Sequence, residues 1–331
     1  MTVIKSNAIR FHQTGGPEVL RWEEVELPEP QVGQARLRHR AVGLNFIDIY
    51  HRSGLYPVPL PSGVGIEGAG VVEAIDAAAS KATGISVGDR VAYAGGPLGA
   101  YAEVRNIPAD RLVKLPEAIS FDTAAAMLLQ GLTAQYLLRR TYKVQPGQTI
   151  LIHAAAGGVG LIACQWAKAL GATVIGTVGN EEKAALARAH GCDHPIIYTR
   201  ENFTERVRAI TGGAGVPVVY DSIGKDTFMG SLDCLSPLGL MVSFGNASGP
   251  VPPVDLGVLG PKGSLFVTRP TLMTYMARRE DLLKSAEELF AVVGAGKVKI
   301  EVNQRYALKD AAMAQTDLAA RRTTGSTILL P

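Results

Sequence analysis

The sequence has few cysteines and no long apolar run. Three cysteines, Cys164, Cys192 and Cys234, occur among 331 residues and form no CxxC pair. This argues against a disulfide framework and a cysteine-rich zinc lobe, and it fits a reducing compartment. The start, MTVIKSNAIRFHQTGG, lacks the apolar core of a signal peptide, and no apolar run approaches the ~18 residues of a membrane span. We therefore expect a soluble, cytoplasmic protein.

An excess of charge of one sign is missing as well. The 33 lysines and arginines barely outnumber the 30 acidic residues, and arginine pairs such as Arg139-Arg140 are short and scattered. The chain thus lacks the basic stripe typical of nucleic-acid binding, and we expect no dedicated nucleic acid partner. Apolar residues make up 47% of the chain, which is typical of a globular protein with a generous core.

The chain, with 331 residues, is longer than the ~100–200 residues typical of one domain, so we expect two domains. Up to about residue 125, short apolar stretches such as DRVAYA and AYAEVR are separated by Gly and Pro, as in a small barrel-like β-domain. An Ala/Leu-rich helix then begins behind Asp122 as its cap. We expect the first part of a β-rich domain at 1–125, an inserted nucleotide-binding domain at 126–268, and a return to the first domain at 269–331.

Strands and helices alternate from residue 149 onward. We expect strands at 149–153, 172–178 and 195–198 and then in VPVVYDSIG, LMVSFGN and GSLFVT, with a helix from Glu181 to about His190. Near-continuous β-branched strands alternating with helices predict an α/β fold with a parallel sheet covered on both faces. The last sixty residues add the helix REDLLKSAEELFAVV, the extended VKIEV, a polar helix and the strand STILL.

A glycine loop, HAAAGGVG, follows the strand at 149–153 and opens a helix. Ala155, Gly157 and Gly160 give the pattern A-x-G-x-x-G, close to the dinucleotide fingerprint, in the strand–loop–helix context that the fingerprint requires. Gly157 would let a pyrophosphate approach the backbone, and Gly160 would permit close helix–strand packing. The alternative is a tight turn without a ligand. The context favours a dinucleotide.

The end of the next strand bears on which dinucleotide is bound. An NAD enzyme usually has an acidic residue there, whereas ATVIGTV runs into Gly179 and Asn180, with Lys183 one turn into the helix. A neutral amide and a lysine suit the 2′-phosphate of NADPH. Glu181 and Glu182 lie between them and weaken the inference. The sequence favours NADPH over NADH.

The chain resembles the zeta-crystallin-type quinone oxidoreductases, a zinc-free branch of the medium-chain dehydrogenase/reductase superfamily. The resemblance runs from GGPEVL through VGLNFIDIYHRSGLYP, HAAAGGVGLIACQWAKALGA and YDSIG to GLMVSFGNASG, KGSLFVTRP and GSTILLP. It implies a GroES-like catalytic domain, a Rossmann domain, NADPH and a homodimer paired through the Rossmann sheets.

Zinc-dependent members of the superfamily resemble one another in a cysteine ligand and a Gly-His-Glu motif. In this chain Asn45 takes the first place, and Ile66 stands where histidine would precede Glu67. Isoleucine cannot ligate, and a carboxylate with an amide is a poor zinc set. We therefore expect no metal.

A pocket without zinc has little means of activating an unconjugated alcohol or carbonyl. Hydride transfer to a quinone or another conjugated carbonyl needs less help, because a few hydrogen-bond donors can stabilise the spread charge. By resemblance, Asn45 and Tyr50 lie near the nicotinamide and Tyr56 near the substrate mouth, and these three are the predicted catalytic residues. In the alternative reading, Asn45 braces its loop and Tyr50 is a core residue. No Ser/His/Asp or Cys/His relay is visible.

The resemblance also implies further cofactor contacts, which lie in the early helix, the glycine loop and the ends of later strands. They are Phe46, Ile47, Asp48, Thr133, Gly158, Val159, Tyr198, Ser222, Phe244, Gly245, Asn246, Phe266, Val267 and Arg321.

Three functions compete. The first is NADPH-dependent reduction of quinones, with one or two electrons per step. The second is two-electron reduction of the alkene of an enal, an enone or an unsaturated acyl thioester. The third is a non-catalytic NADPH-binding protein, with RNA attachment as one version, which the lack of a basic stripe disfavours.

Overall fold

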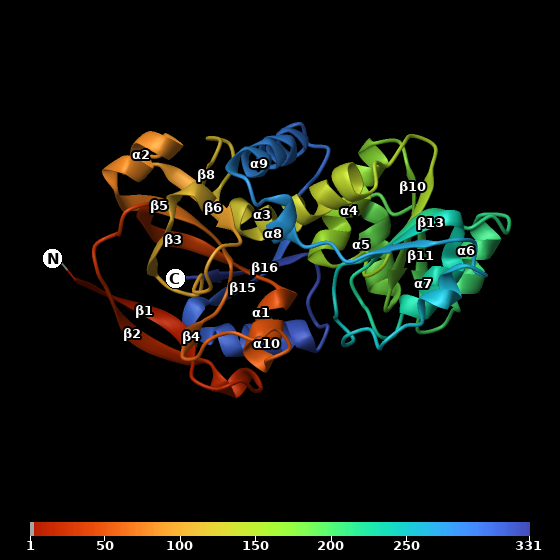
Figure 1. Ribbon diagram of the computed structural model, residues 1–331, viewed down its shortest axis with the longest axis horizontal. Coiled ribbons are helices and arrows are strands. Elements are labelled where there is room, and N and C mark those ends of the chain that lie inside the picture. The colour runs from red at the N-terminus through yellow and green to blue at the C-terminus, as the bar shows by residue number, and fades with distance from the viewer. Residues whose placement is uncertain (1–2) are drawn as a thin grey trace. The chain divides into compact units, whose positions relative to one another are not determined.

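The computed structural model describes residues 3–331, and their contacts divide the chain into two compact units (Figure 1). The first, here called the β-rich unit, contains the chain as far as Leu132 together with Met276–Phe290 and Ile300–Pro331. The second, the parallel-sheet unit, contains Thr133–Tyr275 and Ala291–Lys299. Within residues 3–331 the structure has no helix with the length and apolar character needed to cross a membrane.

The β-rich unit consists of two sheets and short helices. Its three-stranded sheet has the order β2-β1-β4, and its seven-stranded sheet has the order β15-β16-β3-β5-β6-β8 with β7 paired to β3. The strands are β1 (Ile4–Phe11), β2 (Arg21–Leu27), β3 (Gln34–Leu44), β4 (Ser62–Gly63), β5 (Glu67–Ile75), β6 (Arg90–Ala94), β7 (Val104–Pro108), β8 (Val113–Lys114), β15 (Val302–Ala307) and β16 (Ser326–Leu330).

The helices that begin in this unit are α1 (Phe46–Ser53), α2 (Ala77–Thr83), α3 (Phe121–Tyr136), α9 (Arg279–Gly294) and α10 (Ala311–Ala319). One apolar core holds the unit together and draws on both sheets, since Phe11 of β1 and Leu37 of β3 belong to the same buried cluster. The long central strand β3 pairs with β5, β7 and β16. It ends at Leu44, directly before Asn45 and α1, so it fixes where the predicted catalytic segment begins.

The parallel-sheet unit has six strands in the order β11-β10-β9-β12-β13-β14, and every pair is parallel. The strands are β9 (Thr149–Ile152), β10 (Thr173–Val178), β11 (His194–Ile197), β12 (Val216–Asp221), β13 (Leu235–Ser243) and β14 (Phe266–Thr268). The helices are α4 (Gly158–Ala169), α5 (Glu181–Ala189), α6 (Phe203–Ile210), α7 (Phe228–Cys234) and α8 (Leu272–Tyr275). The predicted α/β class with a parallel sheet is confirmed.

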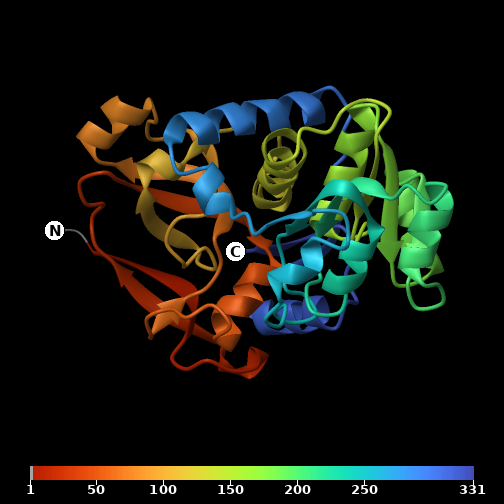
Figure 2. The ribbon, with the colours of Figure 1, turned by 45° about the vertical axis from the view of Figure 1, so that its right-hand side comes forward.

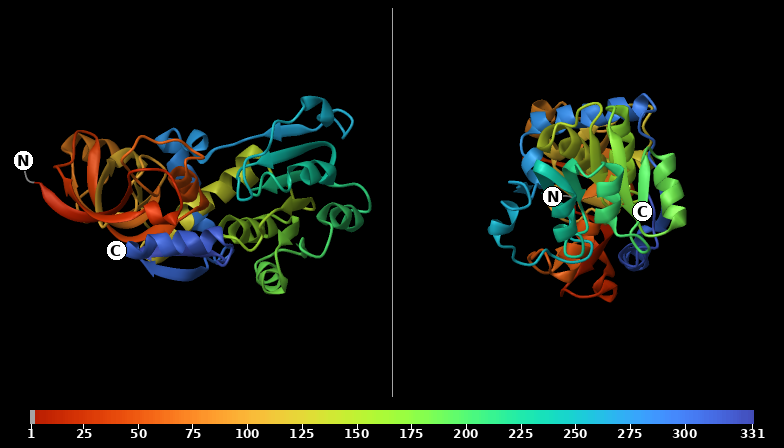
Figure 3. Two further views of the ribbon diagram at one scale, coloured as in Figure 1. Left: turned by 90° about the horizontal axis from the view of Figure 1, so that it is seen from below. Right: turned by 90° about the vertical axis from the view of Figure 1, so that its right-hand side faces the viewer.

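Helices cover both faces of this sheet. From β9 to β11 each new strand is added on one side of β9, and from β12 to β14 each is added on the other side. Because the crossover connections are right-handed, α4 and α5 lie on one face of the sheet and α6 and α7 on the other. The strands and their flanking helices can be followed in Figure 2 and in the right-hand view of Figure 3. Strand β9 lies between β10 and β12, so strand order reverses there. Ligands of open α/β sheets bind at such a switch point, beyond the carboxyl ends of the strands.

Two sequence predictions about element ends are wrong. Helix α3 begins at Phe121, and its cap is Ser120, whose Oγ accepts a hydrogen bond from Thr123 N at 3.1 Å, instead of Asp122. The extended segment expected at 298–302 becomes a strand only at Val302, because the partner strand β16 lies opposite Val302–Ala307. Both errors concern boundaries, which depend on partners distant in the chain.

Candidate functional site

The glycine loop joins β9 to α4 in a strained, tightly packed turn. Ala154 has φ of 53°, a left-handed conformation, and its carbonyl accepts a hydrogen bond from Gly157 N at 2.9 Å. Helix α4 begins at Gly158 with Gly157 as its N-cap, and no side chain caps it. An uncapped N-terminus leaves main-chain N–H groups for an anion, which the helix dipole also favours. The loop thus has the form of a phosphate-binding site.

Gly160 brings α4 close to the loop before it. A Cβ atom at Gly160 would lie 2.8 Å from both Cα and C of Ala155, and closer still to the carbonyl oxygen of Ala154. Gly176 on β10 is crowded in the same way, since a Cβ there would lie 2.6 Å from the Cβ of Ala155. The packing role that the sequence assigned to Gly160 is therefore visible. Phosphate binding by Gly157, Gly158, Val159 and Gly160 stays a prediction.

Other predicted cofactor residues meet at the carboxyl edge of the same sheet. Ser222 directly follows β12, and Phe244, Gly245 and Asn246 directly follow the neighbouring strand β13. A Cβ atom at Gly245 would lie 2.9 Å from the Cα of Ser222, so these two turns touch. The structure thus gathers these residues and the glycine loop at one edge, whereas Phe266 and Val267 lie on the edge strand β14. Thr133 lies on α3, and Arg321 follows α10 in the β-rich unit.

A buried hydrogen-bond network that the sequence did not reveal ties three strand ends together. His153, the first residue after β9, bonds through Nδ1 to Thr177 Oγ1 at 2.8 Å and through Nε2 to Ser231 Oγ at 2.9 Å. Ser231 Oγ donates to Asp221 Oδ2 at 2.9 Å, and burial lowers the pKa of His153. Histidine, serine and aspartate do meet here, but serine lies between the other two, so this is no nucleophilic relay. The network fixes the frame of the glycine loop.

The residues predicted for the adenosine end lie where β10 and β11 finish side by side. Asn180 is the N-cap of α5, and its Oδ1 accepts a hydrogen bond from Lys183 N at 2.9 Å. The Tyr198 ring lies beside Gly179, because a Cβ there would be 3.3 Å from the tyrosine hydroxyl. Gly179 therefore leaves room for Tyr198, which is 42% exposed. These residues form one surface.

In the β-rich unit, Asn45 is buried and held by a chain of side-chain hydrogen bonds. Its Nδ2 donates to Glu67 Oε2 at 2.7 Å, and its Oδ1 accepts from Gln130 Nε2 at 3.2 Å. Ser326 Oγ in turn donates to Gln130 Oε1 at 2.7 Å. Sequence reasoning missed Gln130 and Ser326 and weighed Glu67 only as a zinc position. Together these groups fix the orientation of the Asn45 amide.

Two buried carboxyl groups lie behind this amide. Glu67 is fully buried and accepts Leu129 N at 2.7 Å, and desolvation raises its pKa to about 8. Asp48 is also fully buried; its Oδ2 accepts Asn45 N at 2.9 Å and the Tyr101 hydroxyl at 2.8 Å, and burial raises its pKa to about 7. The Asp48 side chain thus braces the start of α1. Its predicted cofactor contact stays a prediction.

The predicted catalytic tyrosines form an aromatic cluster on and after α1. The rings of Tyr50 and Tyr56 meet edge to face with centroids 5.3 Å apart, and Tyr56 N donates to Tyr50 O at 3.0 Å. Phe46 also lies near Tyr50, with ring centroids 6.2 Å apart, and Ile47, the next residue in the chain, is half-buried. Phe46, Tyr50 and Tyr56 therefore form one cluster on and after α1, which begins directly after Asn45. The catalytic roles of Asn45, Tyr50 and Tyr56 stay predictions.

The positions that the sequence comparison set against zinc ligands have other roles here. Asn45 and Glu67 are hydrogen-bonded to each other, and Ile66 is buried. Across residues 3–331, no three His, Cys, Asp or Glu side chains are arranged to hold a metal ion. The donor set therefore suits hydrogen bonding better than zinc coordination.

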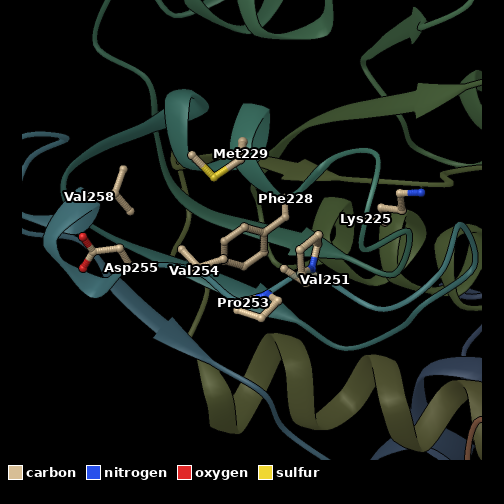
Figure 4. A pocket seen from close by; sticks show the side chains of 9 residues that line it. Lys225, Phe228, Met229, Val251, Pro253, Val254, Asp255 and Val258 are labelled. Carbon is tan, nitrogen blue, oxygen red and sulfur yellow. The ribbon is translucent and has the colours of Figure 1, made fainter.

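An apolar hollow of 340 Å³ lies elsewhere in the parallel-sheet unit (Figure 4). Phe228 and Met229 of α7 line it together with the segment Val251–Asp255, and Lys225 and Asp255 are its charged members. None of the predicted cofactor or catalytic residues lines this hollow, so it is separate from the site described above.

Comparison with known proteins agrees with this geometry. Residues 31–117 match the family model described as an alcohol dehydrogenase GroES-like domain, and residues 158–292 match the model described as a zinc-binding dehydrogenase. The chain thus has the architecture of the GroES-like alcohol dehydrogenase class, with a GroES-like domain and a Rossmann-type sheet.

Comparison with individual proteins identifies the family within this class. The chain is 59% identical to a quinone oxidoreductase of Pseudomonas aeruginosa, over 98% of this chain and 99% of that protein. It is 49% identical to a 2-haloacrylate reductase of a Burkholderia species, over 97% and 98%. The crystal structure of Escherichia coli quinone oxidoreductase complexed with NADPH superimposes with a TM-score of 0.96 at 52% identity, over 98% and 100% of the chains. The chain belongs to the quinone oxidoreductase family, and the resemblance read from the sequence is confirmed.

Proposed function

We propose that the protein is an NADPH-dependent quinone oxidoreductase that works without zinc. The observation that carries this proposal is the uncapped N-terminus of α4 at the switch point of the parallel sheet, where Gly160 lets the helix pack against the loop. The E. coli relative whose crystal structure contains NADPH shares 52% identity with this chain. A purely non-catalytic role is disfavoured, because the relatives described above are named as enzymes.

The parallel-sheet unit has the groups to hold each part of NADPH. Gly157 lets the diphosphate approach the loop, and the main-chain amides of residues 158–160 bind it. Gly179, Asn180, Lys183 and Tyr198 line the adenosine end. Ser222 and the turn 244–246 lie further along the same edge, where they contact the nicotinamide side. The proposed set also includes further residues of this unit, Thr133, Phe266 and Val267, and residues of the β-rich unit, Phe46, Ile47, Asp48 and Arg321. When bound, NADPH supplies the hydride.

The β-rich unit supplies the groups that orient an acceptor. Glu67 takes one hydrogen of the Asn45 amide and Gln130 donates to its oxygen, so the second Nδ2 hydrogen is directed by these two bonds toward an acceptor oxygen. The rings of Tyr50 and Tyr56, which meet edge to face, form an aromatic cluster against which a conjugated ring can pack. A quinone needs such positioning more than it needs a Lewis acid, because its reduced oxygen charge is delocalised.

A second candidate function is reduction of an activated alkene, which the 49% identity to a 2-haloacrylate reductase favours. Both functions need NADPH and a positioned conjugated acceptor. They differ in whether hydride ends on a quinone or on the β-carbon of an unsaturated carbonyl.

Oxidation of NADPH at 340 nm, with a panel of acceptors, tests the proposal. We expect rapid turnover with 1,4-benzoquinone and 9,10-phenanthrenequinone, and slow turnover with 2-alkenals and 2-chloroacrylate. Fast turnover of the alkenes with negligible quinone reduction would show that alkene reduction is the main activity and that the first proposal is wrong. No oxidation with any acceptor would contradict both.

We also propose that the enzyme is a cytoplasmic homodimer with no dedicated nucleic acid partner. Strand β14 lies at the edge of the six-stranded sheet, and its Phe266 and Val267 are 59% and 41% exposed. An exposed apolar edge strand is suited to pairing with a second copy. The three unpaired, buried cysteines support a reducing compartment.

A further inference from the structure

The proposed NADPH site contains an electrostatic conflict in its sequence. Helix α5 opens with Glu181 and Glu182 before Lys183. A 2′-phosphate carries about −1.5 to −2 charges at neutral pH, so the two carboxylates oppose it and Lys183 balances only one of them. A further cation near the start of α5 would therefore favour phosphate binding.

An arginine that follows a neighbouring strand, β11, lies beside the start of α5. The turn after β11 carries Tyr198, Thr199 and Arg200, and β11 runs parallel to β10 with Ile197 opposite Val178. Thr199 Oγ1 donates to the Gly179 carbonyl at 3.0 Å, which fastens this turn over the end of β10. Arg200 Nη1 donates to Glu181 Oε1 at 2.9 Å. Arg200 thus neutralises the first carboxylate of α5.

The ion pair is built so that it can exchange partners. The side chains of Arg200 and Glu181 are 65% and 69% exposed, and an exposed pair of this kind contributes little net stability. A phosphate offers guanidinium a bidentate, doubly charged partner, which binds arginine more strongly than a solvated carboxylate does. Arg200 therefore loses little by leaving Glu181 and gains a stronger contact.

We propose that Arg200 is a further specificity residue for the cofactor: it pairs with Glu181 in the free protein and moves to the adenosine 2′-phosphate when NADPH binds. NADH has a hydroxyl in place of that phosphate, so Arg200 stays on Glu181 when NADH binds. The inference rests on the proposed function, since it concerns the same dinucleotide site.

Binding of adenosine fragments isolates this contact from catalysis. Calorimetry with 2′,5′-ADP and 5′-AMP compares two ligands that differ by the 2′-phosphate. We expect Arg200→Ala to weaken 2′,5′-ADP about tenfold, as loss of a charge-assisted hydrogen bond to phosphate predicts, and to leave 5′-AMP nearly unchanged. Glu181→Gln removes the competing carboxylate and is expected to strengthen 2′,5′-ADP binding.

Arg206→Ala is the matched control. Arg206 lies on α6 and pairs through Nε with Glu201 Oε2 at 2.8 Å, so its removal makes the same change in net charge without breaking an ion pair to α5. We expect it to leave both ligands nearly unchanged. Equal weakening of the two ligands by Arg200→Ala, or equal effects of Arg200→Ala and Arg206→Ala, would overturn the inference.

The same titrations separate this inference from the proposed function. If the unaltered protein binds 5′-AMP as tightly as 2′,5′-ADP, the proposed preference for NADPH is wrong and the role of Arg200 is wrong with it. If the unaltered protein prefers 2′,5′-ADP and Arg200→Ala keeps the whole preference, only the role of Arg200 is wrong. Thermal melting of each variant verifies that the fold is retained.

Discussion

The Asn45 side chain is oriented by a carboxyl group that has no access to solvent. Glu67 takes one amide hydrogen of Asn45, and Gln130 donates to the amide oxygen, so the amide cannot turn over without breaking both bonds. Asn45, the position compared from the sequence with a zinc ligand, is therefore a fixed hydrogen-bond donor. Fixed donors stabilise developing charge without a cost of reorganisation.

Replacing Glu67 with glutamine tests this carboxyl group through the pH dependence of stability. The pKa of Glu67 is raised to about 8 by burial, from an ordinary value of 4.5. Between these pH values the folded protein binds a proton that the unfolded chain has released, so the free energy of unfolding falls as the pH rises. Glu67→Gln is expected to remove the part of this decrease in the free energy of unfolding that Glu67 causes. Urea unfolding at pH values of about 5, 7 and 9 measures it.

The control for this experiment is Glu73→Gln, which changes an exposed carboxylate on the same strand. It is expected to leave the slope of the pH profile unchanged. Asp48, with its pKa raised to about 7, contributes a fall of the same sign in all three proteins. Parallel profiles for the unaltered protein and Glu67→Gln would contradict the assignment.

Single residues also show where the sequence was sufficient and where it was not. Asn45 was found because its segment carries a family motif. Gln130 and Ser326 were not found, because Gln130 lies 85 residues from Asn45 and Ser326 lies a further 196 residues along the chain. Arg200 was missed for the same reason, since parallel pairing of β10 with β11 brings it to Glu181. Contacts of this kind follow from strand order, which a local pattern does not contain.

At the scale of elements, α4 and the loop before it form one packed unit. The helix approaches the main chain of Ala154 and Ala155 so closely that no side chain fits at position 160. The His153 network holds the ends of β9, β10 and β12 beneath the loop. Preformed loops of this type bind phosphate without an ordering cost.

Gly160→Ala is expected to destabilise the protein by about 1–3 kcal/mol, the usual cost of an extra methyl group in a packed site, and to weaken NADPH binding. The control is Gly294→Ala at the end of α9, where a Cβ would meet no atom within 4 Å. That change is expected to be neutral or stabilising, because alanine favours a helix. Urea unfolding and fluorescence titration with NADPH measure the two effects. A Gly160→Ala protein as stable as Gly294→Ala would show that α4 can shift.

The sequence predicted most elements of the sheet because strands buried on both faces are recognisable as apolar runs between helices. It placed the α3 cap and the start of β15 wrongly, because Ser120 and Asp122 are both good caps and only the fold selects one. The pairing of β15 with β16 decided the second case. Element type therefore follows from local pattern, and element ends follow from packing.

At the scale of the whole molecule, the proposed dimer depends on the edge strand β14. Lysine on an exposed edge strand opposes pairing with another sheet. Phe266→Lys is therefore expected to reduce the molar mass from twice the 35.0 kDa of one chain to a single chain, as measured by light scattering after size-exclusion chromatography.

Val32→Lys, an apolar-to-lysine change at an exposed position of the β-rich unit, is the control and is expected to remain dimeric. A Phe266→Lys protein with the mass of two chains would contradict pairing through β14. If the unaltered protein already has the mass of one chain, the proposal of a dimer is wrong.

The closed space around Gly160 restricts how this protein can be redesigned, by evolution or in the laboratory. Every substitution at that position adds an atom where main chain already lies, so the glycine loop, which is the proposed diphosphate site, tolerates little change in sequence. Residues 179–183 and Arg200 lie on the surface, where side chains can be exchanged without repacking the interior. A switch of preference between the two nicotinamide cofactors therefore has to be engineered at that rim, with the loop left untouched.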